Sequence, residues 1–480
     1  MDPVLAFALQ LSPRGSRTLL RALHAQLRAA ILDGRLRPGQ RLPSSRALAQ
    51  AYGISRNTAV AAYDLLLSEG YLRARRASGV HVAELPAAAA PSGATRPAAL
   101  ARRHLSPQAR DAQETDAVAS GGVFRLGVPE LDGLPFEIWR RLGARALRQF
   151  ARTSADYAPA QGREVLRQAI AQHVAFARAV ACRADDVVVT SGAQQAFDLL
   201  ARTLVTPGRT RVAVEEPGYP PLRAAFAAAG AQLVPVCVDA EGLCVAALPP
   251  DVRVICVTPS HQFPLGCAMS AARRAELLGF ARRRDAVVIE DDYDGEFRYA
   301  DRPLDALQTL DGGERVFYVG TFSKSLFPGL RIGYVVAPAW ARAALVAARR
   351  TADSHGDVLA QDTLAAFIAE GHLARHVRRM QAVYAQRRDA VLHGVQRHFS
   401  GVLEPLPSLA GLHLAFASLP EAPLPSWLTR VEPGPGGVAT LRRFRTSRGG
   451  RAGLVLGLGA AELVAVGPAL ASLRQAWTAG

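Results

Sequence analysis

The chain contains a single lysine, Lys324, whereas the other 56 of its 57 basic side chains are arginine. Arginine replaces lysine freely where only surface charge or phosphate contact is needed, but a guanidinium stays protonated and forms no imine. A deprotonated lysine amine condenses with an aldehyde, so Lys324 is the first candidate for covalent chemistry. Its neighbours Thr321, Ser323 and Arg331 supply hydroxyls and a cation that could hold a phosphate. The alternative is that one lysine on a solvated loop escaped replacement by chance, and the other motifs must decide.

Two further motifs follow predicted strands and could bind parts of a flat, phosphorylated ligand. Thr190-Ser191-Gly192-Ala193-Gln194-Gln195 precedes a predicted helix over 196–204. A turn of small residues at a helix N-terminus offers backbone N–H groups and the positive end of the helix dipole to an anion. Glu216-Pro217-Gly218-Tyr219-Pro220 ends the next strand with a tyrosine that could cover a flat ring. Each motif also occurs for structural reasons alone, so their combination carries the argument.

A run of carboxylates, Glu290-Asp291-Asp292-Tyr293-Asp294, lies just past the end of a predicted strand. Open α/β sheets place their active sites at this edge. A carboxylate there could keep a pyridine nitrogen protonated, which is the main way in which a protein controls the electronics of pyridoxal phosphate. The alternatives are acidic helix capping and a metal cluster. Because no histidine lies nearby in the sequence with ligand spacing, we expect no metal site.

Composition sets broad limits on the function. An apolar fraction of 49% over 480 residues is ample for a large core, and the length suggests roughly two to four domains. There is no apolar run of about 18 residues and no signal-like start, so we expect neither a membrane span nor a secreted protein. Five cysteines without metal-ligand spacing are typical of small apolar side chains in a reducing cytoplasm. The formal charge of +16 is compatible with a nucleic-acid partner.

Three zones divide the chain. Residues 1–84 are basic and helix-patterned, and residues 85–120 form an Ala/Pro-rich linker that cannot bury a core. Residues 121–480 alternate apolar strands with amphipathic helices, which predicts an α/β domain. Near-continuous apolar runs, typical of parallel strands covered on both faces, occupy 186–190, 211–214, 252–257, 286–289 and 316–319.

The N-terminal zone predicts a winged helix-turn-helix. A helix over 17–33 is expected to precede two short helices, with Ser44 as the N-cap of the first and Ser55 as the N-cap of the second. The turn Tyr52-Gly53-Ile54 joins these two helices, and the second would present its N-terminal end to base edges and phosphates. Residues 71–82 alternate like a two-stranded wing with Ser78-Gly79 at its tip.

This zone resembles the winged helix of GntR-type bacterial regulators in Leu42-Pro43-Ser44-Ser45-Arg46, Ser55-Arg56-Asn57-Thr58 and Glu69-Gly70-Tyr71-Leu72. The resemblance implies that double-stranded operator DNA is the partner. The residues that it places at or near the DNA are Ser44, Arg46, Arg56, Asn57, Thr58 and Gly79. Either arginine could pair with guanine or with phosphate. The alternative is a three-helix oligomerisation module whose arginines are merely solvated.

Residues 121–480 resemble the fold type I aminotransferases, which use pyridoxal phosphate, in the chain order of phosphate turn, ring cover, carboxylate and lysine. The resemblance implies that Lys324 is the Schiff-base lysine and that Asp291 binds the ring nitrogen, with Asp292 as the competing choice. Tyr293 would bond the phenolic oxygen of the ring, and Tyr219 would stack on the ring. The implied phosphate ligands are Ala193, Gln194, Ser323 and Arg331, together with Tyr157 from the other subunit of a homodimer.

Two departures from that family argue against efficient transamination. In Ser260-His261-Gln262-Phe263-Pro264, Phe263 takes the place of an asparagine that donates a hydrogen bond to the ring oxygen, and phenylalanine has no such donor. The arginine that binds a substrate carboxylate also lacks a clear counterpart. Arg442, Arg443 and Arg451 lie in the expected region, but none falls in a convincing frame.

Over nearly its whole length the chain is similar to the MocR/GabR-like transcriptional regulators. The resemblance implies an N-terminal winged helix-turn-helix joined to a fold type I domain with a mostly parallel sheet. It also implies a homodimer, usually head-to-tail, that holds pyridoxal 5′-phosphate for sensing and controls genes of amino-acid, amine or vitamin B6 metabolism. We therefore expect a cytoplasmic regulator that senses a small amino compound and has at most weak transaminase activity. The alternatives are a genuine aminotransferase with an accessory DNA-binding domain and a regulator that senses the cofactor itself.

Overall fold

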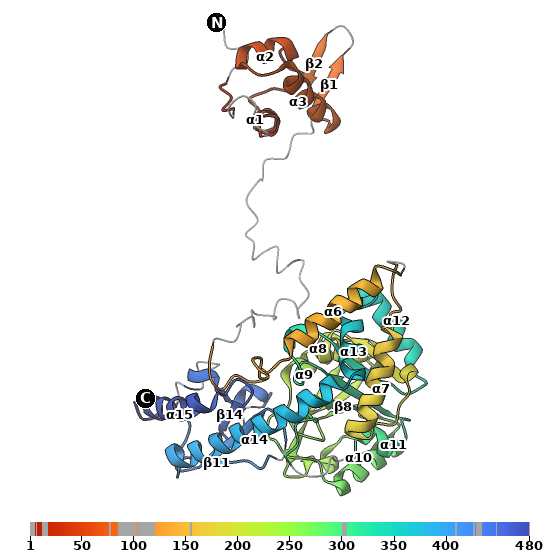
Figure 1. The fold of residues 1–480 in the computed structure, drawn as a ribbon, viewed down its shortest axis with the longest axis vertical. Helices are drawn as coiled ribbons and strands as arrows, with labels where there is room; N and C mark the ends of the chain where they lie inside the picture. Colours follow the sequence, from red (N-terminus) through yellow and green to blue (C-terminus); the bar gives the residue numbers. More distant parts are fainter. Residues whose placement is uncertain are drawn as a thin grey trace. The chain divides into compact units, whose positions relative to one another are not determined.

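The structure is a computed structural model that describes residues 5, 7–11, 18–75, 78–84, 103, 121–153, 156–299, 305–408, 410–425, 428, 434–447 and 449–479. The chain divides into two compact units, Met1–Ala112 and Gln113–Gly480 (Figure 1). Apart from Arg103, the linker predicted for 85–120 lies outside the described residues. No helix within these described ranges is long and apolar enough to cross a membrane.

The N-terminal unit contains three helices and a two-stranded antiparallel ribbon. Its elements are α1 (Leu19–Leu32), α2 (Ser45–Tyr52), α3 (Arg56–Ser68), β1 (Leu72–Arg75) and β2 (Gly79–Val82). Ser44 and Ser55 cap α2 and α3 as predicted, because their side chains accept backbone N–H groups at 3.1 and 3.0 Å. Leu27, Leu48 and Leu66 are fully buried where the three helices meet.

The C-terminal unit is built on an eight-stranded sheet with the order β3-β10-β9-β8-β7-β4-β5-β6. Its strands are β3 (Val187–Thr190), β4 (Arg211–Glu216), β5 (Gln232–Asp239), β6 (Gly242–Leu243), β7 (Val254–Val257), β8 (Val287–Asp292), β9 (Val316–Thr321) and β10 (Gly333–Val336). Strands β9, β8, β7, β4 and β5 are parallel. Strand β10 is antiparallel to β3 and β9, and β6 is antiparallel to β5. The sheet is therefore mostly parallel, which confirms the predicted fold class.

Helices cover both faces of this sheet, because successive strand residues point to opposite sides. Val188 packs into a core with α8, α9 and α12, whereas Val187 and Val189 pack into a core with α6, α7 and α13. Helices α10 and α11 cover the rest of the second face. The helices are α6 (Phe136–Phe150), α7 (Glu164–Arg178), α8 (Gly192–Leu204), α9 (Pro220–Ala228), α10 (Ala271–Arg284), α11 (Leu307–Asp311), α12 (Arg342–Asp353) and α13 (Val358–Ala369).

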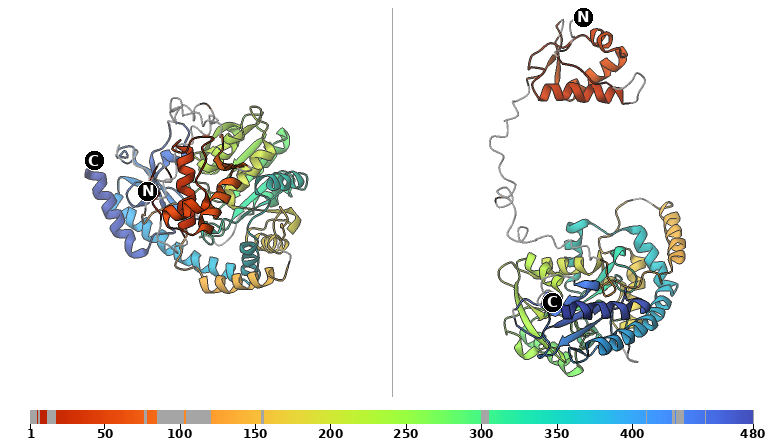
Figure 2. Two further views of the ribbon diagram at one scale, coloured as in Figure 1. Left: turned by 90° about the horizontal axis from the view of Figure 1, so that it is seen from above. Right: turned by 90° about the vertical axis from the view of Figure 1, so that its left-hand side faces the viewer.

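A second, smaller sheet lies in the C-terminal part of the same unit. Its strands are antiparallel in the order β11-β12-β14-β13, with β11 (Leu403–Pro405), β12 (His413–Ser418), β13 (Ala439–Thr440) and β14 (Gly453–Gly457). Helices α14 (His372–Phe399) and α15 (Leu463–Ala479) lie side by side and share a core with this sheet (Figure 2). Phe399, Phe416 and Leu470 are fully buried in that core.

Two element boundaries differ from the sequence-based expectation. Strand β8 continues through Asp292, which pairs with Gly320 of β9, so Glu290, Asp291 and Asp292 lie within the strand and Asp294 lies past its end. Helix α8 begins at Gly192 instead of residue 196, so the small-residue motif forms the first turn of the helix. In both cases the regular backbone hydrogen bonding extends into residues outside the apolar run from which the element was predicted.

Candidate functional site

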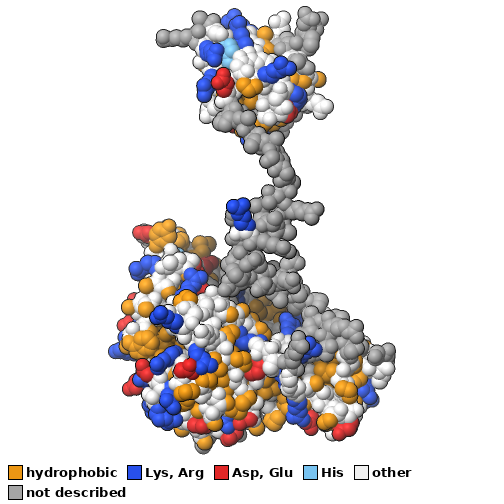
Figure 3. All heavy atoms as spheres, turned by 180° about the vertical axis from the view of Figure 1, so that it is seen from behind, with side chains coloured by type: hydrophobic (Ala, Val, Ile, Leu, Met, Phe, Trp, Pro, Cys, Tyr) orange, Lys and Arg blue, Asp and Glu red, His pale blue; other side chains and the backbone are white. Residues whose placement is uncertain are grey.

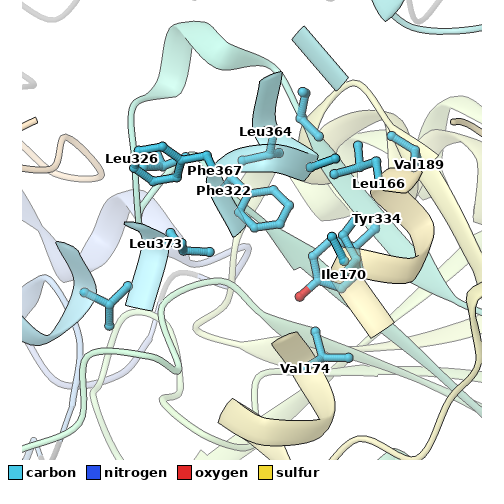
Figure 4. Packing of buried hydrophobic residues seen from close by; sticks show 14 of the residues in the cluster. Leu166, Ile170, Val174, Val189, Phe322, Leu326, Tyr334, Leu364, Phe367 and Leu373 are labelled. Carbon is cyan, nitrogen blue, oxygen red and sulfur yellow. The ribbon is translucent and has the colours of Figure 1, made fainter. Parts of the chain in front are cut away.

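Lys324 lies three residues past the end of β9, in a loop that apolar side chains hold in place. Phe322 and Leu326, on either side of the lysine, are 1% exposed. In Figure 4 they lie among side chains from α7 and α13, including Leu166 and Leu364. The backbone that carries the amine is therefore anchored in a packed core.

The Lys324 amine donates a 2.7 Å hydrogen bond to the carbonyl of Gly127. Gly127 has a φ of +72°, and a Cβ atom there would lie 2.8 Å from Nζ. Burial lowers the pKa of Lys324, and the charges of Asp294 and Asp291 oppose this shift. A lowered pKa increases the neutral, nucleophilic fraction of the amine. Gly127 is a contact that the sequence analysis missed, since nothing local marks it as a partner of a residue so far along the chain.

Asp291 and Asp292 point to opposite faces of β8 and have different environments. Asp292 is paired with Arg178 at 2.5 Å and accepts a 2.6 Å hydrogen bond from Tyr318. Asp291 is 4% exposed, and its Oδ1 has no hydrogen-bond partner among the described residues. Burial raises the pKa of Asp291 well above its usual value, and the charge of Asp292 raises it further. A buried carboxyl without a partner is costly, so Asp291 is the carboxylate that a cationic ligand group would stabilise.

The N-terminus of α8 and Arg331 form a second polar group of the site. Ser191 precedes α8 without capping it through its side chain. Arg331 Nη2 donates to the Ser191 carbonyl at 2.8 Å, and the guanidinium covers Gly192 so closely that a Cβ would lie 3.1 Å from it. Ser323 Oγ accepts a 3.0 Å hydrogen bond from Thr321 Oγ1. Uncapped N–H groups at a helix N-terminus beside a guanidinium are suited to binding a phosphate.

The two predicted backbone ligands lie in the first turn of α8. Ala193 is partly buried, and Gln194 is exposed and donates from its side chain to the Pro221 carbonyl at 3.1 Å. Gln195, which had no predicted role, closes the turn, because its Oε1 accepts the Ser191 N–H at 2.7 Å.

Aromatic side chains form the apolar wall of the site. The ring of Phe263 makes edge contacts with Tyr219 and Tyr293, at centroid distances of 5.6 and 6.0 Å. It also contacts His413 at 5.1 Å and Phe444 at 4.9 Å. The charges of Asp291 and Arg331 both act on the pKa of Tyr219, which burial raises to about 12. Tyr219 and Phe263 therefore lie in the same neighbourhood as the carboxylate and the guanidinium.

His261, Asp294 and His413 form a buried cluster that the sequence analysis did not anticipate. Their potential ligand atoms lie within 4.8 Å of one another, a spacing at which a metal ion is conceivable. Asp294 bonds His261 Nδ1 at 3.0 Å, however, and His413 Nε2 bonds the Pro264 carbonyl at 3.1 Å. Hydrogen bonds therefore account for the cluster. The expectation of no metal rested on sequence spacing alone, which cannot detect histidines that come from other strands and loops.

The remaining predicted residues are Tyr157 and the three candidate arginines. Tyr157 is 84% exposed, and its ring approaches that of His355 at 6.0 Å. Arg451 pairs with Glu404 of β11. Arg442 and Arg443 are exposed at the 3-10 turn Leu441–Phe444. No arginine is thereby identified as a carboxylate ligand.

The residues predicted to meet DNA lie on the surface of the N-terminal unit. Ser44, Arg46, Arg56, Asn57 and Gly79 are exposed, whereas Thr58 is partly buried and bonded to Ser55 at 2.8 Å. Within the described ranges neither Arg46 nor Arg56 has an ion-pair partner, and Figure 3 shows basic side chains on the surface of this unit. Uncompensated arginines at the start of a helix are suited to phosphate and base contacts.

The two units match two different protein families. Residues 19–82 match the bacterial regulatory proteins of the gntR family, and residues 122–414 match aminotransferase class I and II. Among solved structures, the kynurenine aminotransferase of Pyrococcus horikoshii has a TM-score of 0.72 and 25% identity, over 79% of this chain and 98% of that one.

Relatives that resemble most of the chain are regulators. The probable rhizopine catabolism regulatory protein MocR of Rhizobium meliloti is 39% identical over 82% of this chain and 80% of its own length. The transcriptional regulator TauR of Rhodobacter capsulatus is 37% identical, over 80% of this chain and 81% of its own length. The pyridoxine biosynthesis regulator PdxR of Corynebacterium glutamicum is 34% identical, over 79% of this chain and 80% of its own length.

Proposed function

Because the chain belongs to the MocR/GabR-like transcriptional regulators, we propose that it binds pyridoxal 5′-phosphate through Lys324 and converts recognition of an amino compound into a change in operator binding. As a member of this family the chain is a DNA-binding transcriptional regulator with an aminotransferase-like domain. The single observation that carries the proposal is that its only lysine lies beside a buried carboxyl with an unpaired oxygen.

The residues fit the cofactor at its three distinct chemical groups. Asp291, buried with an unpaired oxygen, would pair with the ring nitrogen, because a protonated pyridine is the partner that this carboxyl lacks. The uncapped turn at Ala193 and Gln194 would hold the phosphate together with Ser323 and Arg331. Tyr219 would cover the ring, and Tyr293 would bond its phenolic oxygen.

When bound, pyridoxal phosphate supplies an aldehyde that can be transferred between the Lys324 amine and the amine of another molecule. Lys324 contributes a nitrogen whose pKa burial lowers, so part of it is neutral and able to attack. Gly127 positions this nitrogen through its carbonyl. Ligand exchange changes what occupies the space beside Phe263, and regulation requires that the two states of the protein bind the effector with different affinity.

Sensing is favoured over turnover by what surrounds the lysine. Phe263 offers no hydrogen-bond donor, and its ring is packed against four other aromatic rings. Arg451, one of the three candidate arginines for a substrate carboxylate, pairs with Glu404 instead. We therefore propose at most weak transaminase activity. The exposed Tyr157 is available to a second subunit in a homodimer, and a DNA-binding regulator would act in the cytoplasm where its operator is.

The proposal is tested by spectral titration of the purified full-length protein with candidate amines and amino acids. Wild-type protein should show the absorbance of bound cofactor near the visible edge, and one class of amine should shift it. Lys324→Ala should lack this absorbance, and Lys324→Arg, which keeps the charge but cannot form an imine, should lack it too. If the band persisted in both variants, the role of Lys324 would be wrong.

DNA binding of the same samples separates a regulator from an enzyme. The amine that shifts the absorbance should also change the affinity for operator fragments selected from genomic DNA. Arg56→Ala should lose DNA affinity and keep the cofactor absorbance. Conversion of an amino acid and a keto acid at ordinary enzyme rates, with no effect of the amine on DNA binding, would instead identify a genuine aminotransferase.

A further inference from the structure

Among the residues that the structure describes, His261 alone bonds the hydroxyl of Tyr293. Tyr293 Oη donates to the His261 backbone carbonyl at 3.1 Å and lies 2.9 Å from His261 Nδ1. A hydroxyl has one proton and can accept two further hydrogen bonds. Because that proton is directed at the carbonyl, Tyr293 Oη must accept from Nδ1.

The partners of His261 hold its ring at both nitrogens. Ser408 Oγ donates to the Ala410 carbonyl at 2.9 Å and lies 3.2 Å from His261 Nε2. Nδ1 faces both oxygens of Asp294, at 3.1 and 3.0 Å, and a carboxylate only accepts. The proton of Nδ1 is therefore directed at the side where Asp294 and Tyr293 Oη lie.

The segment before β12 encloses this pair. Asp294 Oδ2 accepts the backbone N–H of Leu412 at 3.2 Å. Gly411 packs so closely that a Cβ atom there would lie 2.1 Å from His261 Cε1. His261 and Asp294 are each about 1% exposed in their side chains. The buried pair is thus confined between the loop that carries Phe263 on one side and Ser408 with residues 410–412 on the other.

We propose that the buried His261–Asp294 pair is a positioning device that makes Tyr293 a hydrogen-bond donor to the bound cofactor. The Nδ1–H of His261 donates to Tyr293 Oη, so this oxygen is an acceptor on the side of His261. The proton of the Tyr293 hydroxyl can then turn from the His261 carbonyl to a bound ligand. Asp294 holds the His261 ring at Nδ1, and Ser408 holds it at Nε2. This inference rests on the proposed function, because it assigns residues that act on the same cofactor site.

The surrounding ionisable groups come from four strands or the loops that follow them. Asp294 and Tyr293 follow β8, His413 lies on β12, Lys324 follows β9, and Glu215 lies on β4. The ring of His413 lies 4.6 Å from that of His261 and is buried, and burial lowers the pKa of His413 to about 3, with the charge of His261 adding to this. His413 is therefore neutral, and Asp294 is the acidic group in direct contact with His261. The other charges that act on Tyr293 are those of Asp291, Asp292 and Glu215.

The test is a pH titration of the absorbance of the cofactor-loaded protein, which reports the proton on the Lys324 nitrogen. His261→Gln and Tyr293→Phe should each raise the midpoint by about one unit, a tenfold change in proton affinity. The rise is expected because a ring oxygen that has lost its donor is a better acceptor for that proton. The double variant His261→Gln/Tyr293→Phe should move the midpoint no further than Tyr293→Phe alone, because His261 acts through Tyr293.

Two other variants separate positioning from general damage. Ser260 lies next to His261 in the same loop, and its side chain accepts a buried hydrogen bond from Arg178 of α7. Ser260→Ala removes this bond, so it should lower thermal stability without moving the midpoint. Ser408→Ala removes the contact with Nε2 and the hydrogen bond to the Ala410 carbonyl, and leaves His261 and Tyr293 unchanged. It should move the midpoint in the same direction as His261→Gln by a smaller amount, and it provides the test if His261→Gln fails to fold.

Each outcome bears on the proposal. Additive shifts in the double variant, or an unmoved midpoint in both His261→Gln and Ser408→Ala, would overturn the positioning role and leave the proposed function standing. If Ser260→Ala moved the midpoint as far as His261→Gln does, the effect would come from general disruption of the loop, and the positioning role would be overturned as well. Wild-type protein without cofactor absorbance would overturn both the inference and the proposed function.

Discussion

Replacing Asp291 with asparagine should have opposite effects on the stability of the cofactor-free protein and on its affinity for pyridoxal phosphate. Asp291 is buried, its Oδ1 is unpaired among the described residues, and burial raises its pKa well above the usual value. An amide of the same size removes the ionisable group from this environment. The same amide cannot supply the negative charge that a protonated ring nitrogen needs.

The size of each effect follows from the environment of the carboxyl. Replacing the buried ionisable carboxyl with a neutral amide should stabilise the cofactor-free protein by about 1 to 3 kcal/mol at pH 8, because a buried charge costs more than a buried amide. Losing a buried, charge-assisted hydrogen bond should weaken cofactor binding by about 2 to 4 kcal/mol, or roughly 30- to 1,000-fold.

The pH dependence has a definite sign. The folded-state pKa of Asp291 lies above its unfolded value, so its contribution to stability is fully present below the unfolded pKa. That contribution is lost as the pH rises through the folded pKa. Asp291→Asn should therefore gain most over wild type at high pH and least at low pH.

The assay is urea denaturation of cofactor-free wild-type and Asp291→Asn protein at several pH values, followed by absorbance titration with pyridoxal phosphate. A matched control is Asp292→Asn, which breaks the buried pair with Arg178 and should destabilise the protein. If Asp291→Asn were less stable than wild type at every pH, or bound the cofactor equally tightly, the assignment of Asp291 as the unpaired partner of the ring nitrogen would be refuted.

Three further predictions concern Glu215, Gly127 and the DNA-binding surface. Burial raises the pKa of Glu215 to about 7. Wild-type protein should therefore lose up to about 3 kcal/mol of stability relative to Glu215→Gln as the pH rises from 4 to 8. If the free energy of unfolding in urea changed with pH equally in both proteins, this prediction would be wrong. Gly127→Ala should displace the Lys324 amine and alter the cofactor spectrum, whereas Gly401→Ala, with the same φ of +72° and no neighbour within 4 Å, should cost stability only. Arg56→Ala should weaken operator binding by about 1 to 3 kcal/mol if Arg56 contacts a base. If Arg56 contacts a phosphate, the slope of log affinity against log salt concentration should fall by about one. An operator affinity and a salt slope that both stay unchanged in anisotropy titrations would exclude both contacts.

The outcome at the winged helix shows what local sequence can determine. Ser44 and Ser55 cap their helices as expected, because an N-cap depends on a hydroxyl and the backbone three residues ahead of it. The alternation of apolar strands and amphipathic helices likewise predicted a mostly parallel sheet with both faces covered. These features follow from contacts between residues that are close in the chain or from a repeating pattern.

Distant contacts were beyond the reach of the sequence. Gly127 meets Lys324 across 197 residues, and Ser408 meets His261 across 147 residues. Nothing in the local pattern of either partner indicates the other. No histidine lies near the acidic run in the sequence, so the sequence did not predict the cluster that His261 and His413 form around Asp294.

The sequence by itself determined the chemistry that is available: one primary amine among guanidinium groups, a carboxylate run, an anion-binding turn and an N-terminal DNA-binding motif. Only the tertiary structure decided which of two adjacent carboxylates is free, since the pleat of β8 turns Asp292 toward Arg178 and leaves Asp291 without that cation. It also brought His261 and Asp294 together behind Tyr293. Residue type determines what a side chain can do, whereas burial and the charges that folding places around it determine in which protonation state, and toward which partner, it does so.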